Sequence, residues 1–598
     1  MTIISLVRKY ASPLALLTVL LGMAAAPYLI TENPDSTIFR SGFLSLLLLL
    51  ACIPPIREAL RRASLRTLIC GAAFGLLFSV AMSLGAELHI YGGLLPGMGS
   101  LLRRIAVPVM SAPLFGCLAA QLMIAFEYRS NNKQAVHLPL LAYMAILIIC
   151  WLPVLIAYYP GMLNYDVYTE YTQYAAGEWD SRHPLLYIVL CYAVYALGDL
   201  ASQPTLAILV ITLLRMIYFA AALAYSCVFI QRRHAPRWAL WMMTASYALL
   251  PIFSVMAVSS AKDTPFAASV LLLSLFSWEV LEEPQAFFAN KKKKLLLILS
   301  IILTWHLRKN GIAALILLPL LIIVAKGYRR QITSLCATGV LLSALLALGM
   351  NFVLQPTAQP SYQTYSIPAQ QLVRAYHVGD MTEEEREELR NWYRSSEWGL
   401  QLLPHLADAA KGTLLVDRLN QESDAFMDLW KRVGKKNLRV YTEAFLLLNI
   451  GSWYPDDQTH ANIYRPYGSD IGYLPTNEYD LSEYGIRKYD LLPGVRALFE
   501  QICRRNSYQK YPVISQLFCT ATPLWLTLFA VFTLIAQKRG RLAITAASVL
   551  ALWLSYLLGP CTLARYTLPL FCLAPAMVSQ LFVFQSDRPF TSRKETCP

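Results

Sequence analysis

The chain has 598 residues, of which 56% are hydrophobic and only 15% are charged. A soluble domain has about 25% charged residues, so this composition excludes an ordinary water-exposed surface. The net charge of +14 would suggest nucleic acid in a soluble protein, but Lys and Arg also collect in the cytoplasmic loops of membrane proteins, so we expect no nucleic-acid partner.

Apolar runs recur along the chain, and each is long enough to cross about 30 Å of hydrocarbon as a helix. The runs do not alternate as barrel strands would, so we predict an all-α polytopic membrane protein. Residues 1–136 form a first group of transmembrane helices, which opens with a retained helix after Arg8 and Lys9. The first five predicted crossings are 11–30, 41–56, 67–86, 105–125 and 138–158.

Residues 137–354 form the predicted transmembrane core. The linker 57–66 is rich in arginine and is expected in the cytoplasm, which places the loop 159–184 outside after five crossings. The apolar stretch Leu185–Leu197 is too short to span, so it predicts a re-entrant or short helix. The full crossings that follow are 204–230, 238–258, 264–281, 294–307, 310–326 and 331–354.

Residues 516–598 form the predicted C-terminal transmembrane helices and a cytoplasmic tail. Their expected crossings are 516–536, 541–558 and 565–585. Three later basic linkers are separated by pairs of helices and are all expected in the cytoplasm. These linkers are 291–294, 326–330 and 538–541. The resulting topology has about fourteen crossings plus the short helix, with both termini on the cytoplasmic side of the cell membrane.

The stretch 355–515 is hydrophilic and far longer than an ordinary connection between helices. Its aromatic content argues against disorder, so we predict a mostly helical extracytoplasmic loop domain that covers the membrane bundle. One helix is expected over 381–403 with Thr382 as its N-cap, and a second over 420–433.

The outer loop 159–184 contains Asp166, Glu170 and His183 among several tyrosines. A carboxylate beside the membrane surface can act as a general base on an acceptor hydroxyl, or it can help to hold a metal. The alternative is that an outer loop simply contains polar residues.

Lys262 and Asp263 lie at the predicted outer end of two successive crossings. We expect Asp263 and Thr264 to cap the next helix, with Pro265 in its first turn. Capping does not exclude a function, because adjacent Lys and Asp side chains at the outer rim can also serve a charged ligand.

Two further segments carry basic residues on the predicted outer side, against the usual distribution. Arg308 and Lys309 precede Asn310, and Arg565 precedes Tyr566 at the start of the last crossing. Arg and Lys are suited to bind phosphate. The alternative is that their side chains snorkel at the membrane interface.

A fifth candidate is the segment Trp453–Asp457, which lies near His460 and Arg465. Its paired acids either lie over a membrane site or are simply solvated, and the solvated interpretation is favoured. The sequence has no P-loop, dinucleotide-binding glycine pattern, zinc-protease motif or nucleophile elbow. Arg215 is the main ionisable residue inside a predicted crossing, and this scarcity weakens the case for an ion-coupled transporter.

The order of these segments resembles the GT-C superfamily of multipass glycosyltransferases, which take sugar from a polyprenyl-phosphate carrier. The likeness begins with Pro160-Gly161 followed by Asp166, and continues with His183-Pro184. The segments around Lys262, Arg308 and Arg565 extend it, and Ser366–Gln371 and Trp453–Pro455 resemble a little-characterised bacterial branch. The resemblance covers about residues 138–580.

The resemblance implies that a sugar moves to a glycan, lipid or protein of the cell envelope at the outer face of the membrane. Asp166 would activate the acceptor, and Asp263 would be a second acid. Lys262, Arg308, Lys309 and Arg565 would steady the donor phosphate. Supporting roles would fall to Glu170, His183, Asn310 and Tyr566.

No cofactor is required by this resemblance, although it leaves room for a divalent cation, Mg²⁺ or Mn²⁺, with unknown ligands. Two other functions stay open from the sequence. One is a transporter or flippase of a lipid-linked glycan precursor. The other is a polymerase or ligase of glycans that are already carried on lipid.

Overall fold

The computed structural model describes residues 3–29, 42–127, 137–163, 165–181, 183–325, 327–357, 361–456, 480–503 and 512–583. Within these ranges every regular element is a helix, and the β-type pairs are isolated bridges. The prediction of an all-α protein is therefore confirmed for the part of the chain that the structure describes.

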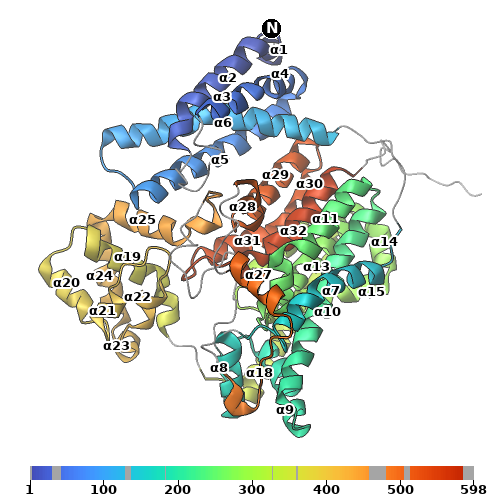
Figure 1. Ribbon diagram of the computed structural model, residues 1–598, viewed down its shortest axis with the longest axis vertical. Helices are drawn as coiled ribbons and strands as arrows, with labels where there is room; N and C mark the ends of the chain where they lie inside the picture. Colours follow the sequence, from blue (N-terminus) through green and yellow to red (C-terminus); the bar gives the residue numbers. More distant parts are fainter. Residues whose placement is uncertain are drawn as a thin grey trace, which may run out of the picture.

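The N-terminal helices form the upper part of the molecule in Figure 1. They are α1 (Ile3–Lys9), α2 (Ala11–Ala25), α3 (Gly42–Ala51), α4 (Ile53–Arg62), α5 (Leu65–Tyr91) and α6 (Met98–Glu127). Helices α5 and α6 form a hairpin so close that an added Cβ at Gly75 would collide with the backbone of Gly116. Small residues of this kind let two apolar helices approach without a water-driven core.

The predicted crossing 41–56 differs from the structure, which has two short helices there. Helix α3 ends at Ala51 and α4 begins at Ile53, with Pro54 and Pro55 in its first turn. Proline cannot continue a helix because it lacks the N–H group and clashes with the preceding turn. The ten residues of α3 rise about 15 Å, roughly half of the hydrocarbon thickness.

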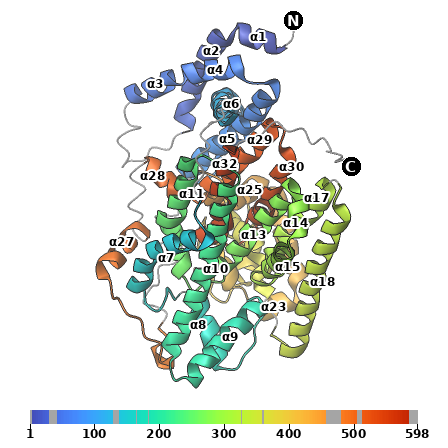
Figure 2. The same cartoon turned by 90° about the vertical axis from the view of Figure 1, so that its right-hand side faces the viewer.

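The core helices follow in chain order. They are α7 (Leu140–Ala157), α8 (Tyr165–Ala175), α9 (Leu185–Leu200), α10 (Pro204–Arg232), α11 (Arg237–Leu249), α12 (Pro251–Val258), α13 (Asp263–Glu282), α14 (Pro284–Ala289), α15 (Lys291–His306), α16 (Gly311–Ala314), α17 (Leu317–Val324) and α18 (Arg329–Leu354). The short helix expected after His183 is present as α9, which lies beside α8 at the lower end of the molecule (Figure 2).

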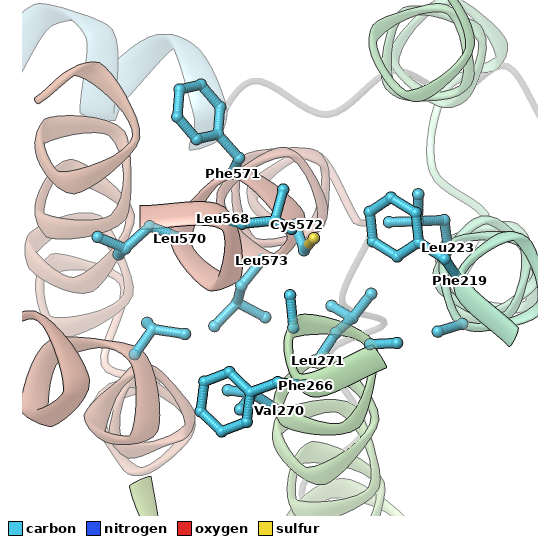
Figure 3. Close-up of a cluster of buried hydrophobic side chains, with 14 of the residues drawn as sticks. Phe219, Leu223, Phe266, Val270, Leu271, Leu568, Leu570, Phe571, Cys572 and Leu573 are labelled. Carbon is cyan, nitrogen blue, oxygen red and sulfur yellow. The ribbon is translucent and has the colours of Figure 1, made fainter. Parts of the chain in front are cut away.

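The C-terminal helices return to the centre of this core. They are α28 (Pro512–Phe518), α29 (Thr522–Ala536), α30 (Gly540–Ala543), α31 (Ala547–Tyr556) and α32 (Ala564–Leu581). Helix α32 packs against both α10 and α13. Figure 3 shows the apolar side chains that meet between them, including Phe219, Phe266 and Leu568. This packing places the first turns of α13 and α32 at the same end of the bundle.

Seven described helices are long and apolar enough to cross a membrane, and the bent pair α11–α12 adds an eighth if it forms one span. All eight coincide with predicted crossings. Helix α18 exposes Leu345, Leu348 and Phe352 by 55%, 68% and 82%. Such surfaces are suited to lipid rather than water. The other six predicted crossings contain shorter, broken or less apolar helices, so the count of fourteen stays a prediction.

The stretch 355–515 contains a helical domain with its own core, at the left of Figure 1. Its helices are η2 (Ser361–Tyr365), α19 (Ser366–Val378), α20 (Glu383–Arg390), α21 (Ser396–Gly399), α22 (Asp408–Gly412), α23 (Val416–Gln421), α24 (Ser423–Lys436) and α25 (Leu438–Leu448). We call these residues, 361–448, the loop domain. The second helix expected over 420–433 corresponds to α24.

The predicted cap at Thr382 is confirmed, because its side chain and that of Glu385 form a reciprocal capping box. The predicted length of that helix, 381–403, is wrong. Helix α20 ends at Arg390, and the chain then turns so that Trp392 enters the core of the loop domain against Phe426. Tertiary burial of this large ring overrides the local helical pattern.

Candidate functional site

The ends of α13 and α32 bring an acid and a base together. Asp263 opens α13, and Arg565 lies in the first turn of α32. Nη1 of Arg565 lies 3.5 Å from Oδ2 of Asp263. Both side chains are buried, so each charge depends on partners inside the protein.

Asp166 reaches the same place from the first turn of α8. Its Oδ2 accepts a hydrogen bond from Nη1 of Arg565 at 2.7 Å and another from Nζ of Lys262 at 3.1 Å. The segments that precede Asp166 and Lys262 are joined by backbone hydrogen bonds. The N–H of Met162 donates to Val258 at 3.0 Å.

Gly161 lets the chain pass at this point. Its φ is +152°, and an added Cβ would collide with the side chain of Thr212 on α10. Only glycine combines this backbone conformation with so close an approach. The Pro-Gly pair before Asp166 therefore sets the position of the outer loop against α10.

Arg308 completes this group of ion pairs. Its guanidinium pairs with Asp263, and it lies over the rings of Tyr566 and Tyr556 at 4.5 Å and 5.1 Å from their centroids. Contact with aromatic faces holds a guanidinium in place while leaving its N–H groups available at the edge. We call Asp166, Lys262, Asp263, Arg308 and Arg565 the ion-pair cluster.

The expectation that Asp263 and Thr264 cap α13 is wrong. The residue before the helix is Lys262, and no side chain caps its first turn. The Asp263 carboxylate is turned to two arginines, and the Thr264 hydroxyl donates to the carbonyl of Met256 at 2.6 Å. Charge pairing with buried guanidinium groups outweighs a local hydrogen bond to the helix end.

Glu170 and His183 form a second group beside the cluster. Nδ1 of His183 lies 2.9 Å from Nζ of Lys262 and 3.7 Å from Oε1 of Glu170. Glu170 is completely buried, and its Oε2 accepts a hydrogen bond from the hydroxyl of Tyr187 at 3.0 Å. Arg215 in turn donates to this hydroxyl at 2.8 Å.

Tyr187 and Arg215 were not among the candidate site residues predicted from the sequence. Arg215 carries a visible signal, because it is the main charge inside a long apolar helix. Tyr187 carries none, since tyrosines are abundant in this region of the sequence. Their place beside Glu170 follows only from the packing of α9 against α10.

Two other predicted residues lie at the edge of the site. Lys309 is exposed and interacts electrostatically with Asp180 and Lys262. The amide of Asn310 donates to Ser555 at 3.2 Å, which joins the start of α16 to α31. Lys309 is therefore placed for a ligand at the rim, whereas Asn310 holds two helices together.

The two carboxylates of α8 have very different environments. Burial alone would raise the pKa of Asp166, but Lys262 and Arg565 beside it hold that pKa well below its usual range. Burial raises the pKa of Glu170 to about 7, because Lys262 and Arg215 offset the loss of water only in part. Burial also lowers the pKa of the Lys262 ammonium.

The ion-pair cluster has more positive than negative charge. Three cations, Lys262, Arg308 and Arg565, face the two carboxylates of Asp166 and Asp263. Arg565 is buried, and Lys262 and Arg308 are exposed by only 12% and 13%. An excess of positive charge that is largely removed from water is costly without a counter-charge, so the cluster is suited to an anionic ligand.

The carboxylates of the site are engaged by cationic side chains rather than grouped around a common point. Among the described residues, no group of three or more His, Cys, Asp or Glu side chains is arranged to hold a metal ion. The Asp166 and Asp263 carboxylates are already paired with Lys or Arg.

The candidate segment Trp453–Asp457 is only partly described, because Asp457, His460 and Arg465 lie outside the described residues. The residues of this segment that are described are packed against neighbouring helices. Tyr454 is fully buried against Gly85 of α5, and the carbonyl of Trp453 accepts from the indole N–H of Trp525 at 2.9 Å.

The loop domain contacts the chain just before the site. The backbone N–H of Ala407 donates to the carbonyl of Pro560 at 2.8 Å, and Leu406 forms an isolated bridge with Cys561. Arg565 follows four residues after Cys561. Movement of the loop domain would therefore act directly on the strand-like segment that leads into α32.

In the part of the chain that the structure describes, these features define a helical protein with several helices apolar enough to cross a membrane and with buried ion pairs where several helix ends meet. The chain belongs to a family of unknown function, DUF6020, whose model matches residues 177–595. The matched residues include Lys262, Asp263, Arg308 and Arg565, whereas Asp166 precedes them. No curated protein and no solved structure matches the chain.

Proposed function

We propose that the protein is a membrane glycosyltransferase of the GT-C type. It moves a sugar from a polyprenyl-phosphate donor to a cell-envelope glycan, lipid or protein at the outer face of the cytoplasmic membrane. The observation that carries this proposal is the convergence of Asp166, Lys262, Asp263, Arg308 and Arg565, which are up to 399 positions apart in sequence.

The charge of the cluster supports a phosphate-linked donor. A phosphodiester carries a single negative charge, which matches the excess positive charge of the cluster. Arg308 and Arg565 hold the departing phosphate, and Asp263 keeps both guanidinium groups oriented. Lys309 and Tyr566 border the same site, where Tyr566 contacts both arginines.

Asp166 has the role of acceptor-activating base. When the donor phosphate draws Lys262 and Arg565 toward itself, the Asp166 carboxylate loses the cations that hold its pKa down. It can then accept the proton of an acceptor hydroxyl as that oxygen attacks the anomeric carbon. Donor binding therefore activates the base.

The position of the cluster favours a transferase over a transporter. Asp166, Asp263 and Arg565 lie in the first turns of their helices, whereas transport sites usually lie near the middle of the membrane. An end position gives access to a lipid headgroup and to an acceptor outside the bilayer.

The proposed topology has about fourteen crossings, both termini in the cytoplasm and the stretch 355–515 outside. Contacts among the predicted outer segments support it. The loop domain meets Gly92 at the end of α5 and Pro560 before α32, and Thr357 pairs with Trp179 of the outer loop. Segments on opposite sides of the membrane could not make these contacts.

The test is the glycan composition of a deletion strain that carries the wild-type gene or an Asp166→Ala version. We expect the wild-type gene to restore the composition and Asp166→Ala to fail, because the acceptor is no longer activated. General-base removal typically costs about 10²- to 10⁴-fold in rate.

The matched control is Asp428→Ala in α24, a carboxylate whose side chain is 61% exposed. It should restore the composition fully at the same membrane abundance. Full restoration by Asp166→Ala would remove this residue as the base. If loss of the protein instead leaves lipid-linked sugar on the inner face and no transfer product, the flippase alternative is favoured.

A further inference from the structure

Asp166 is poorly suited to keep the proton that it accepts. Two cations lie within 3.1 Å of its Oδ2, and they hold the pKa of this carboxyl well below its usual range. A base in this environment releases its proton as soon as Lys262 and Arg565 return. A complete reaction therefore needs a nearby group that retains the proton.

Glu170 occupies the right place for that group. It lies one helical turn after Asp166 on α8, so both side chains are on the same face of the helix. Two side chains connect them. Lys262 contacts Asp166 at 3.1 Å and His183 at 2.9 Å, and His183 lies 3.7 Å from Oε1 of Glu170.

The two oxygens of Glu170 are held differently. Its Oε2 accepts a hydrogen bond from the hydroxyl of Tyr187, and that hydroxyl in turn accepts a hydrogen bond from Arg215. Its Oε1 is buried and has no hydrogen-bond partner within the described part of the chain, apart from the longer contact with His183. A buried carboxyl oxygen in this state is a natural place for a proton.

We propose that Glu170, acting through His183 and Lys262, receives the proton that the acceptor hydroxyl gives to Asp166. The inference rests on the proposed transferase function. Because Glu170 acts through other groups and does not touch the substrate, it is a positioning residue. We call Asp166, Lys262, His183 and Glu170 the proton relay.

The acceptor oxygen forms a bond to the anomeric carbon, and the bond from that carbon to the phosphate oxygen breaks with its electron pair left on phosphate. The hydroxyl proton passes to Asp166. Lys262 gives a proton to Nδ1 of His183 and regains one from Asp166, and the same Nδ1–H passes its proton to Oε1 of Glu170 once the 3.7 Å between these two atoms closes to hydrogen-bond distance.

The relay has a defined pH dependence. Burial raises the pKa of Glu170 to about 7, so this side chain becomes deprotonated, and able to accept a proton, only as the pH rises through that value. Transfer should therefore increase with pH through about 7. The charged and titratable groups that interact with Glu170 come from α8, α9, α10 and the adjoining loops, and they are Asp166, His183, Tyr187, Cys191, Tyr192, Tyr195, Arg215 and Lys262.

The first measurement is an infrared pH titration of the purified full-length protein. A protonated carboxyl has a C=O band that ionisation removes, so the wild-type protein should lose such a band as the pH rises through about 7. Glu170→Gln should lack this change. Asp166→Asn should move the midpoint to lower pH, because the Asp166 charge raises the pKa of Glu170.

The second measurement is the rate of glycan synthesis as a function of pH. It uses membrane vesicles from the deletion strain carrying each gene version, and these vesicles supply their own donor and acceptor. Glu170→Gln keeps an oxygen for Tyr187 but cannot take the proton. We expect about a tenfold to hundredfold loss of rate and a flat pH profile. Glu170→Asp should recover part of the rate and a sloped profile, which a purely structural role does not predict.

The two proposals fail in different ways. The relay is overturned if wild-type protein shows no titrating carboxyl band, if Glu170→Gln keeps that band, or if it makes glycan with the wild-type pH profile. The transferase proposal is overturned if wild-type protein shows the Glu170 band and yet makes no glycan in any vesicle preparation. If a variant folds poorly, the absence of a titrating carboxyl band in the wild-type protein would still overturn the relay.

Discussion

At the scale of single residues, the cluster has a bridging acid. Asp263 is 1% exposed and pairs with both Arg308 and Arg565, whereas Asp166 pairs with Arg565 and Lys262. Loss of Asp263 would therefore leave Arg308 without the carboxylate it pairs with, whereas Arg565 would keep its pair with Asp166. The cost of an unpaired buried charge exceeds the gain that the pair provided.

We predict that Asp263→Asn destabilises the protein by about 3–5 kcal/mol, because Arg308 loses its carboxylate partner and Arg565 keeps only Asp166. The measurement is the melting temperature of the purified protein in detergent. The control Asp428→Asn should change it little, because that carboxylate is exposed in α24.

A second variant separates charge from packing. Asp263→Asn combined with Arg308→Gln should recover part of the lost melting temperature, because the cation that Asp263→Asn leaves unpaired is removed as well. An Asp263→Asn protein that melts like the wild type would show that the two arginines find other partners, and it would contradict the role given to this residue.

At the scale of elements, the loop domain is fastened to the α5–α6 hairpin through Glu443. This buried carboxylate accepts from Arg374 and Arg439 at 2.8 Å each, and from the backbone N–H of Leu94 at 3.2 Å. Arg374 also donates to the carbonyl of Gly92 at 2.6 Å. The fastening joins two elements that are distant in sequence.

We predict that Glu443→Ala loosens this contact, because two arginines are left without a carboxylate at the tip of the hairpin. Backbone hydrogen exchange at residues 92–95 and in α19 should increase. The measurement is hydrogen–deuterium exchange with mass spectrometry, and the control is Glu387→Ala at an exposed position of α20.

The outcome that would contradict this prediction is unchanged exchange at residues 92–95 in Glu443→Ala. In that case the apolar contacts of Tyr454 with α5 would be sufficient to hold the hairpin in place. Increased exchange throughout the chain would indicate general unfolding rather than local release.

At the scale of the whole molecule, the fold was predictable where a single physical requirement dominates. Long apolar helices such as α10 and α18 follow from the thickness of the bilayer, and the Thr382 cap follows from a local motif. Two breaks inside predicted helices were not anticipated. They depend on Pro54 and Pro55 in one case and on burial of Trp392 in another.

Part of the candidate site was predictable from basic residues on the side of the membrane where they are usually rare. Basic residues on the predicted outer side pointed to Arg308 and Arg565, and both lie in the ion-pair cluster. The pairing itself was not predictable, because it depends on packing between α13 and α32. The same limit applies to Tyr187, whose contact with Glu170 has no signature in sequence.

The last prediction concerns the orientation of the whole chain in the membrane. The proposed topology places the loop domain outside and the basic linker before α15 inside. A cysteine at Glu387→Cys should therefore react with a membrane-impermeant maleimide on intact cells. A cysteine at Lys292→Cys should react only after the membrane is opened. Both positions are exposed in the structure, so access is decided by the membrane and not by burial.

Labelling of the wild-type chain supplies the background from its own cysteines, of which those in the described residues are buried or half-buried. The reverse pattern, with Lys292→Cys labelled on intact cells and Glu387→Cys protected, would place the ion-pair cluster at the cytoplasmic face. That result would contradict the proposed topology and would remove an extracytoplasmic sugar acceptor from consideration. Because α13 and α32 begin at the cluster, the orientation of these two helices decides which compartment its ligand comes from.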